Sequence, residues 1–347
     1  MRVEYPLDLD DLRTLPQLIR TLEAVGYDGV ATVETRHDPF APLVLAAEHS
    51  QRLQLATGVA IAFPRSPMIT AYTAWDLQAF SGGRFALGLG PQVKAHNERR
   101  FSVPWSAPVP RLREYILALR AIWACWQHGT PLNFRGQHYT FTLMTPFFTP
   151  PPLEHPMIPI HLAAVNPAMA RLAGELADGI RLHPFISPRY LREVILPAVH
   201  DGAARAGRTL AAFTVVGAGF IVTAPHERDL HQQREHVRQQ LAFYASTPSY
   251  RRVMEVHGWA ETADTLAQLA RQGRWDAMAA CMTDEMLETF ALITPDAALP
   301  ERLAERYGGL VDVVQLALPL ETPEQQARAA DLIARIHALP EAHAPQP

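Results

Sequence analysis

Helices followed by short, continuously apolar strands recur along the chain. In LPQLIRTLEAVGYDGVATVE, an amphipathic helix ends at Gly26 and the strand Val30–Val33 follows. AMARLAGELADGIRLHP has the same order, with an Asp-Gly turn before the strand Ile180–Leu182, and ERLAERYGGLVDVVQLALP has it again near the end of the chain. Apolar strands that alternate with helices predict a parallel sheet that is buried on both faces.

Five further strands bring the predicted number to eight. They are Val3–Tyr5, Leu53–Ile61, Phe85–Leu89, Ile160–Ala163 and Phe213–Val222. Eight strands alternating with helices predict an α/β fold with a single (β/α)₈ TIM barrel, and an open doubly wound sheet is the alternative. We expect one domain over residues 1–340, with insertions near 129–159, where prolines cluster, and near 245–275, and a flexible tail over 341–347. We expect the first insertion to lie at the strand-end face.

Barrel enzymes build their sites from the loops that follow the strands. The loop after the second strand, ETRHDPF, holds Glu34, Arg36, His37 and Asp38, and His183 follows the sixth strand. Arg84 precedes its strand, so we expect it to anchor the opposite end of the barrel.

Composition narrows the class of protein. Hydrophobic residues make up 48% of the 347 residues and charged residues 19%, which is enough apolar material for a large core. A net charge of −4 without a basic cluster argues against nucleic acid. We find no signal peptide and no apolar run of membrane-spanning length, and we read Cys125 and Cys281 as free thiols, so we expect a cytoplasmic protein that binds no membrane. Fifteen histidines occur without an HxH or HExxH motif, so no metal site is predicted.

Several ordered motifs resemble the luciferase-like flavin and deazaflavin superfamily. They are TGVAIAFPRSPMITAYTAWDLQAFSGGRFALGLG, with its S-G-G-R and G-x-G, and AAVNPAMARLAGELADG. ETRHDPF, LMTPFFTP and HPFISPRYL resemble the branch of F420-dependent oxidoreductases of unassigned substrate. The resemblance implies a bacterial-luciferase-like barrel, the cofactor F420 with FMN as the alternative, a small-molecule substrate and a homodimer.

The resemblance also implies roles for individual residues. His37 is the expected catalytic residue, because imidazole exchanges a proton near neutral pH, and a cap of its own loop is the alternative role. A cis peptide bond that does not involve proline is expected within Gly58–Ile61. The residues expected to bind the cofactor are Val59, Ala60, Arg65, Gly90, Gln92, Lys94, His96, Ala164, Val165 and Asn166.

The expected substrate pocket contains Trp105, Phe147, Phe148 and His183. Two positions depart from the family pattern: Arg36 stands where an aspartate is usual, and Asn166 where glycine is frequent. Residues 92–97 contain none of the acids that sugar-phosphate reductases carry in that loop, which disfavours a sugar-phosphate substrate.

Three functions therefore compete. The first is hydride transfer between F420 and a small, apolar carbonyl compound, alcohol or activated alkene. The second is an FMN-dependent monooxygenase. The third is a barrel that binds cofactor without turnover, which the substitution at Arg36 favours.

Overall fold

The computed structural model describes residues 1–8 and 10–341. The chain forms two compact units. Glu4–Ala163 and Glu175–Gly179 make up the N-terminal unit, and Met1–Val3, Ala164–Gly174 and the chain from Ile180 on make up the C-terminal unit. From residue 342 on, the predicted tail lies outside the described residues.

Parallel strands form the centre of the N-terminal unit. In this unit β1 pairs with β2, β2 with β3, β3 with β5, and β5 with both β4 and β8, all in parallel. The side chains of Val30, Leu55 and Leu87 are fully buried, as the apolar runs require. The strands are β1 (Arg2–Leu7), β2 (Gly29–Thr32), β3 (Gln54–Thr57), β4 (Ala60–Ile61), β5 (Phe85–Gly90) and β8 (Ile160–Ala163).

The strand predicted over Leu53–Ile61 is divided in two. The peptide bond between Gly58 and Val59, in the gap between β3 and β4, is cis, which confirms the predicted cis bond. The Gly58 amide donates to the carbonyl of Thr32 at 2.6 Å, so the gap remains tied to β2.

The C-terminal unit contains β9 (Gly179–Arg181) from Ile180 on, together with β10 (Thr214–Val216) and β13 (Val313–Gln315), and β10 pairs with β13 in parallel. The strand predicted over Phe213–Val222 is wrong in one respect, because the chain breaks at Gly217, whose φ is 107°. Its second half, β11 (Phe220–Ala224), pairs with the unpredicted strand β12 (Ala291–Pro295). Gly219 allows this departure, since a Cβ there would lie 2.3 Å from the Phe290 carbonyl oxygen.

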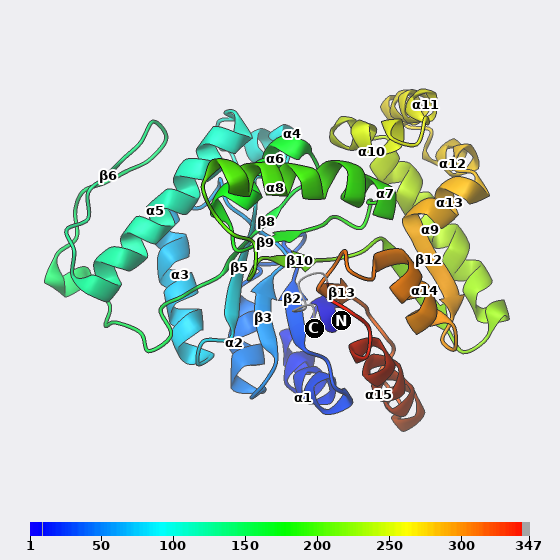
Figure 1. Cartoon of the computed structure of the whole chain (residues 1–347), viewed down its shortest axis with the longest axis horizontal. Coiled ribbons are helices and arrows are strands. Elements are labelled where there is room, and N and C mark those ends of the chain that lie inside the picture. The colour runs from blue at the N-terminus through cyan, green and yellow to red at the C-terminus, as the bar shows by residue number, and fades with distance from the viewer. Residues whose placement is uncertain (9, 342–347) are drawn as a thin grey trace. The chain divides into compact units, whose positions relative to one another are not determined.

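The fold class is α/β, and the strands form a closed, parallel (β/α)₈ barrel, as predicted (Figure 1). Within the described residues, the barrel has eight strands when β3 and β4 are counted as one. The carboxyl ends of these strands carry the loops singled out from the sequence.

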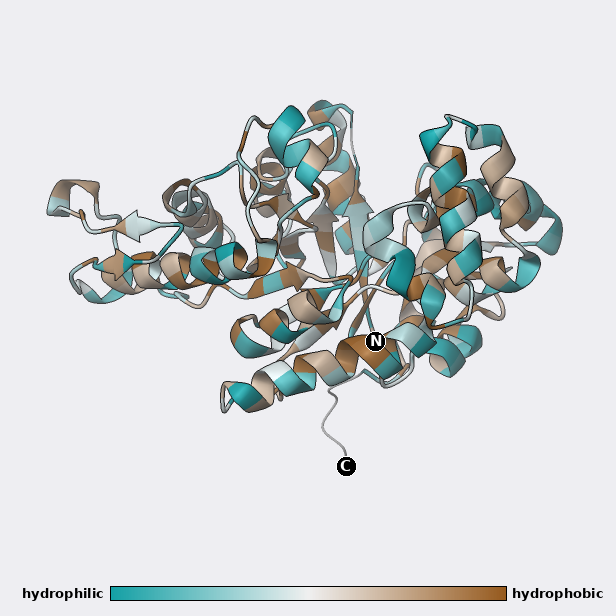
Figure 2. Cartoon of the chain, turned by 90° about the horizontal axis from the view of Figure 1, so that it is seen from above, coloured by the Kyte–Doolittle hydropathy of each residue, from teal (hydrophilic) through white to brown (hydrophobic). Residues whose placement is uncertain are grey.

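Helices connect the strands. Figure 2 shows mixed polar and apolar residues along them, the pattern of helices that bury one side. Helix α1 ends at Gly26 in the left-handed conformation, with φ of 100°, as predicted. The α-helices are α1 (Leu15–Val25), α2 (Ala41–Glu48), α3 (Pro67–Phe80), α4 (Lys94–Arg99), α5 (Pro108–His128), α6 (Pro167–Leu176), α7 (Pro188–Tyr190), α8 (Leu196–Arg205), α9 (His231–Ala245), α10 (Arg251–Glu255), α11 (Ala260–Arg271), α12 (Trp275–Met278), α13 (Asp284–Phe290), α14 (Leu299–Tyr307) and α15 (Pro323–His337). Shorter turns are η1 (Leu12–Thr14), η2 (Pro146–Phe148), the π-helical η3 (Leu191–Ile195), η4 (Glu227–Leu230), η5 (Pro248–Tyr250) and η6 (Ala279–Cys281). Among the described helices, none is long and apolar enough to cross a lipid bilayer.

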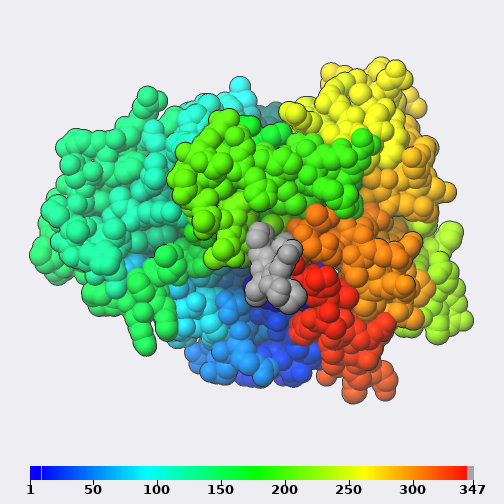
Figure 3. Space-filling model, viewed as in Figure 1, coloured from blue at the N-terminus to red at the C-terminus, as the bar shows by residue number. Residues whose placement is uncertain are grey.

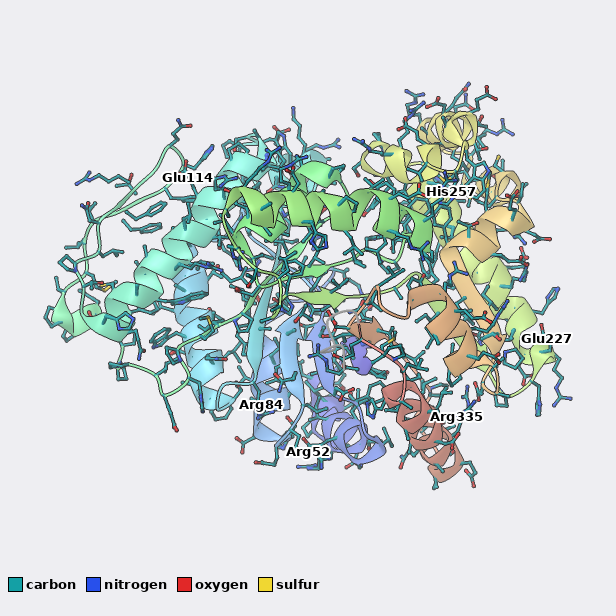
Figure 4. The ribbon with its side chains drawn as sticks, in the orientation of Figure 1. Arg52, Arg84, Glu114, Glu227, His257 and Arg335 are labelled. Atoms are coloured by element: carbon teal, nitrogen blue, oxygen red, sulfur yellow. The ribbon has the colours of Figure 1, made fainter. Side chains whose placement is uncertain are left out.

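Arg84 anchors the end of the N-terminal unit where the strands begin, as predicted. Its guanidinium donates to the carbonyl of Leu53 at 2.8 Å and to the carbonyl and hydroxyl of Ser50 at 3.1 and 3.0 Å. Figure 4 shows Arg84 and Arg52 near each other at this end. The Arg52 amide is held by the Glu23 carboxylate at 2.6 Å. These contacts make Arg84 a structural residue far from the strand-end loops.

The first insertion begins with the hairpin of β6 (Phe134–Arg135) and β7 (Thr140–Phe141). Tyr139 of this hairpin accepts from Arg111, which also donates to the Phe63 carbonyl in the loop after β4, and the later part of the insertion runs along α3. The Trp75 indole donates to the carbonyl of Pro151 at 3.2 Å, and the Gln78 amide donates to that of Met157 at 2.9 Å. The insertion forms the teal to green surface at the left of Figure 3. The second insertion contains η5, α10 and α11.

Candidate active site

His37 lies in a small hollow at the carboxyl ends of β1 and β2. Its side chain is 54% exposed, and Nε2 lies 3.6 Å from Oδ1 of Asp10. The imidazole is therefore open to solvent and to a ligand while a carboxylate stands beside it. The hollow is lined by Leu7, Asp8, Thr32, Val33, Thr35, His37, Asp38 and Pro42.

Arg36, which departs from the family pattern, pairs with acids from the loop after β1. Its guanidinium lies 2.8 Å from Asp10 and 3.4 Å from Asp8. All three side chains are more than half exposed, so these pairs add little to stability. Their effect is local, because Arg36 fixes the position of the carboxylate that faces His37. Sequence reasoning missed Asp8 and Asp10, since their loop carries no motif.

Glu34, Arg65 and Asp38 form a network beneath this loop. The Glu34 side chain is only 7% exposed and accepts from the Ile61 amide at 2.6 Å and from Arg65 at 2.7 and 2.9 Å. Arg65 also donates to Asp38 at 3.1 Å. Asp38 in turn accepts from the amide of Phe40 at 2.8 Å. Arg65, expected at the cofactor, is thus occupied in joining the loops after β2 and β4.

The loop after β5 holds four residues expected at the cofactor. Gly90 packs closely on the residue after the cis bond, since a Cβ on Gly90 would lie 2.8 Å from Cγ2 of Val59. Gln92 has a left-handed backbone, with φ of 57°. Lys94 is 65% exposed and lies 3.9 Å from Glu98, and His96 is exposed. The loop is held by buried Asn97, whose amide donates to the carbonyls at positions 91 and 93 at 2.9 and 3.1 Å.

The aromatic residues expected at the substrate occupy different surroundings. Trp105 is half-buried and packs edge-on against Phe63, with ring centroids 6.2 Å apart. Phe147 and Phe148 are 89% and 62% exposed, and the Phe148 carbonyl accepts from the Tyr72 hydroxyl on α3 at 3.2 Å. Neither phenylalanine lines the hollow beside His37.

Ala164, Val165 and Asn166 follow β8 and lead into α6 in the C-terminal unit. Oδ1 of Asn166 accepts from the Met169 amide at 3.0 Å, so Asn166 caps α6 as its sequence position indicates. The carbonyl of Val165 accepts from the Tyr190 hydroxyl at 2.9 Å. Burial raises the pKa of Tyr190 to about 12, so this hydroxyl remains a donor at neutral pH.

His183 lies just after β9 in an aromatic environment. Its ring centroid lies 4.5 Å from that of Tyr244 and 4.8 Å from that of Tyr250. Burial lowers the pKa of His183 to about 4, so its imidazole is neutral at pH 7. The two tyrosines come from α9 and η5, and no sequence motif indicated them.

The loop after β9 is joined to the turn that follows α10. The Ser187 hydroxyl and Nε2 of His257 are 2.7 Å apart, and the same hydroxyl accepts from the Tyr190 amide at 3.0 Å. Figure 4 shows His257 among the helices of the second insertion. Because Ser187 is fully buried, this pair is a structural contact rather than an exposed nucleophile. Among the described residues, no group of three His, Cys, Asp or Glu side chains is placed to hold a metal ion.

A closed parallel barrel with an open histidine at a strand end defines a barrel enzyme of the (β/α)₈ class. The sequence profile of the luciferase-like monooxygenase family matches residues 2–313. The chain therefore belongs to the luciferase-like monooxygenase family.

Three similar proteins illustrate this membership. An uncharacterized protein of Mycobacterium tuberculosis is 48% identical over 293 residues, covering 84% of this chain and 86% of its own length. The 5,10-methylenetetrahydromethanopterin reductase of Archaeoglobus fulgidus is 29% identical over 311 residues, covering 86% of this chain and 88% of its own. The structure of the coenzyme F420 dependent tetrahydromethanopterin reductase of Methanopyrus kandleri matches with a TM-score of 0.76 at 21% identity, covering 97% of this chain and 99% of its own. The chain is an enzyme of this family, and its relatives include a putative coenzyme F420-dependent oxidoreductase of Mycobacterium tuberculosis, 29% identical over 294 residues.

Proposed function

We propose that this enzyme transfers hydride between coenzyme F420 and a small, uncharged, mainly apolar organic substrate. The observation that carries the proposal is His37, an open imidazole in a hollow at the carboxyl ends of β1 and β2. The similarity to F420-dependent reductases supports the choice of cofactor. When bound, F420 supplies the hydride chemistry.

The residues present fit such a cofactor. The missing Cβ of Gly90 lets the backbone after β5 pack on Val59, so backbone rather than side chains faces a ligand here. Lys94 offers an exposed cation for an anionic group, because its contact with Glu98 is long, at 3.9 Å. We propose that Val59, Ala60, Gly90, Gln92, Lys94 and His96 hold the cofactor together with Ala164, Val165 and Asn166.

The proposed roles follow from the contacts of each side chain. His37 holds or accepts a proton at Nε2, the nitrogen that lies 3.6 Å from Asp10. Arg65 acts through Glu34 and Asp38 as a positioning residue, since its Nη1 and Nη2 groups already donate to these carboxylates. Trp105 and His183 contact the substrate. For Phe147 and Phe148, contact with substrate would require the first insertion to leave α3.

A second candidate is an FMN-dependent monooxygenase, favoured by the description of the matching family as monooxygenases. A third, a barrel that binds cofactor without turnover, is favoured by the pairing of Arg36 with Asp8 and Asp10.

Titration of the apoprotein with F420 and with FMN, followed by absorbance and fluorescence, tests the proposal. We expect F420 to bind at least about tenfold more tightly than FMN, a difference of ~1.4 kcal/mol. Tighter binding of FMN would establish the second candidate. Tight binding of F420 with no oxidation of its reduced form by any ketone, alcohol or alkene would establish the third.

We also propose that residues 1–340 act as one domain and that the enzyme is a homodimer. Exposed apolar side chains on and beside α3 support the dimer, because a surface of this kind is usually covered by a partner. Their exposed fractions are 58% for Ile69, 53% for Phe80, 89% for Phe147, 62% for Phe148 and 74% for Met157.

A further inference from the structure

Four aromatic side chains of the C-terminal unit form a cluster after β9. His183 and Phe185 come from the loop after that strand, Tyr244 from α9 and Tyr250 from η5. The ring of Tyr250 lies 5.7 Å from Phe185 and 6.0 Å from Tyr244, and both tyrosines lie within 5 Å of the His183 ring centroid, at 4.5 and 4.8 Å. We call these four residues the tyrosine cluster.

The cluster holds polar atoms that lack a protein partner. Nδ1 of His183 accepts from the Phe185 amide at 3.0 Å, so in the neutral imidazole the proton lies on Nε2. Across the described chain, no residue hydrogen-bonds to Nε2 of His183 or to the hydroxyls of Tyr244 and Tyr250. None of these three atoms is fully enclosed by protein, so each keeps some exposure to solvent. Three donors therefore stand open in an aromatic setting.

All three donors are uncharged near neutral pH. Burial lowers the pKa of His183 to about 4, and burial raises the pKa values of Tyr244 and Tyr250. These pKa shifts come from burial alone and, for Tyr250, also from the neighbouring Tyr244, with no carboxylate or cation contributing. A charged ligand would lose its hydration here without gaining a counter-charge.

Contacts with Phe290 and His257 hold the loop that carries His183 and Phe185. Phe185 stacks on Phe290 with centroids 4.5 Å apart, and the contact of Ser187 with His257 joins the loop after β9 to the turn that follows α10. Figure 4 labels His257 in this region. A pocket for a small molecule needs such preset polar groups among apolar walls.

We propose that the tyrosine cluster binds the oxygen of an uncharged aromatic ketone, or of the corresponding alcohol. Nε2 of His183 and the Tyr250 hydroxyl donate to the two lone pairs of the oxygen, with the Tyr244 hydroxyl beside them, and the rings of His183, Tyr244 and Tyr250 contact the flat apolar body. The inference deepens the proposed function and rests on it, since it assigns the substrate class of that enzyme.

Calorimetric titration of the full chain, with F420 bound and without it, tests the inference using acetophenone as the probe and benzoate as its charged counterpart. We expect acetophenone to bind at least about tenfold more tightly than benzoate. Tyr250→Phe and His183→Asn should each weaken acetophenone binding about three- to tenfold, because each removes one donor. Asparagine keeps an acceptor for the Phe185 amide. In the matched control Tyr307→Phe, the lost hydroxyl already bonds the Gly219 amide at 2.8 Å, so affinity should stay unchanged.

Equal binding of benzoate, no binding of acetophenone, or unchanged affinity in both cluster variants would overturn the inference. The F420 titration of the same samples separates this failure from that of the proposed function. If acetophenone binds and F420 does not, the proposed cofactor is wrong and the proposed ligand site stands. If F420 binds and acetophenone does not, the proposed cofactor stands and the ligand site is wrong.

Discussion

Three neighbouring residues after β2 have separate tasks. Glu34 is 7% exposed and its carboxylate is bonded to Ile61 and Arg65, so it holds the loop. Asp38 caps the start of α2 through the Phe40 amide. His37, between them, keeps its ring open. A residue whose ring makes few structural contacts can change protonation without disturbing the fold.

Replacing His37 by alanine should slow hydride transfer about 10²- to 10⁴-fold and change F420 affinity little, because a proton donor acts in the transition state. Single-turnover reduction of bound F420 and the F420 dissociation constant, measured in mutant and parent, separate the two effects. His128→Ala, at the exposed end of α5, is the control and should leave both values unchanged. An unchanged rate at saturating F420 would move the role to His96 or His183.

His183 should make stability depend on pH. Its pKa is lowered by burial from 6.5 to about 4 in the folded chain, so between these values only the unfolded chain takes up the proton. The free energy of unfolding should therefore fall by on the order of 3 kcal/mol as the pH drops from 6.5 to 4. Tyr244 and Tyr250, which face the ring, stay neutral over this range.

Urea unfolding of the parent and of His183→Asn at several pH values measures this effect as a difference between the two proteins. The free energy of unfolding of the parent, minus that of His183→Asn, should become smaller as the pH falls from 7 to 4.5. A difference that stays constant over this range would show that the folded and unfolded chains protonate His183 alike. His257, whose pKa is also lowered by burial, acts equally in both proteins.

At the scale of elements, Glu114 on α5 holds the hairpin of β6 and β7. Its carboxylate accepts from the amides of Gln137 and His138 at 2.9 and 2.7 Å. Figure 4 shows Glu114 beside this hairpin. Gly136 leaves room for this carboxylate, because a Cβ would lie 2.1 Å from Oε2 of Glu114 and would displace it. A two-stranded hairpin is marginal alone, so this carboxylate helps to hold it against α5, together with the packing of Tyr139 on Tyr115.

Glu114→Ala should raise amide exchange at residues 137–139 roughly tenfold, as expected for hydrogen bonds worth ~1.4 kcal/mol. Burial acts to raise the pKa of Glu114, but the amide hydrogen bonds outweigh it and lower the pKa. In the parent, protection should therefore hold above pH 4.5 and be lost as the pH falls through the lowered value. Hydrogen exchange followed by mass spectrometry measures the effect of the substitution and the effect of pH. Glu114→Gln keeps one acceptor oxygen, so its exchange rate should lie between those of the parent and of Glu114→Ala. Equal exchange in all three proteins would exclude a role for Glu114 in holding the hairpin.

At the scale of the whole molecule, the first insertion changes what α3 presents to solvent. Because the segment near Pro151 and Met157 binds Trp75 and Gln78, its own apolar side chains are turned outward beside those of α3. The sequence placed Phe147 and Phe148 in a substrate pocket. Their exposure of 89% and 62% is what the proposed surface between two copies of the chain requires.

The double substitution of Phe147 and Phe148 by aspartate should weaken dimerisation roughly 30-fold or more, since buried aromatic anchors contribute ~2 kcal/mol or more. Sedimentation velocity over a concentration series measures the change. Trp275→Asp, at an aromatic residue 55% exposed on α12, should leave the dimer intact. A parent that sediments as a monomer at all concentrations would exclude the dimer.

The sequence by itself determined the barrel and the location of its loops. Periodicity gave the strand positions because each strand is apolar on both faces, and Gly26, Arg84 and Asn166 have local roles that neighbouring residues define. It also indicated His37, since a residue in a short loop directly after a strand must lie near the carboxyl end of that strand. The cis bond at Gly58 followed from the family motif.

Only the tertiary structure decided which side chains meet across long separations. Asp10 meets Arg36 and His37, Arg65 meets Glu34, and His183 meets Tyr244 and Tyr250 through folding of segments that share no local pattern. The division of Phe213–Val222 likewise depended on a close approach of Gly219 to Phe290. Local pattern encodes which face of an element is buried, whereas partners distant in sequence are set by packing, and packing is a property of the whole chain.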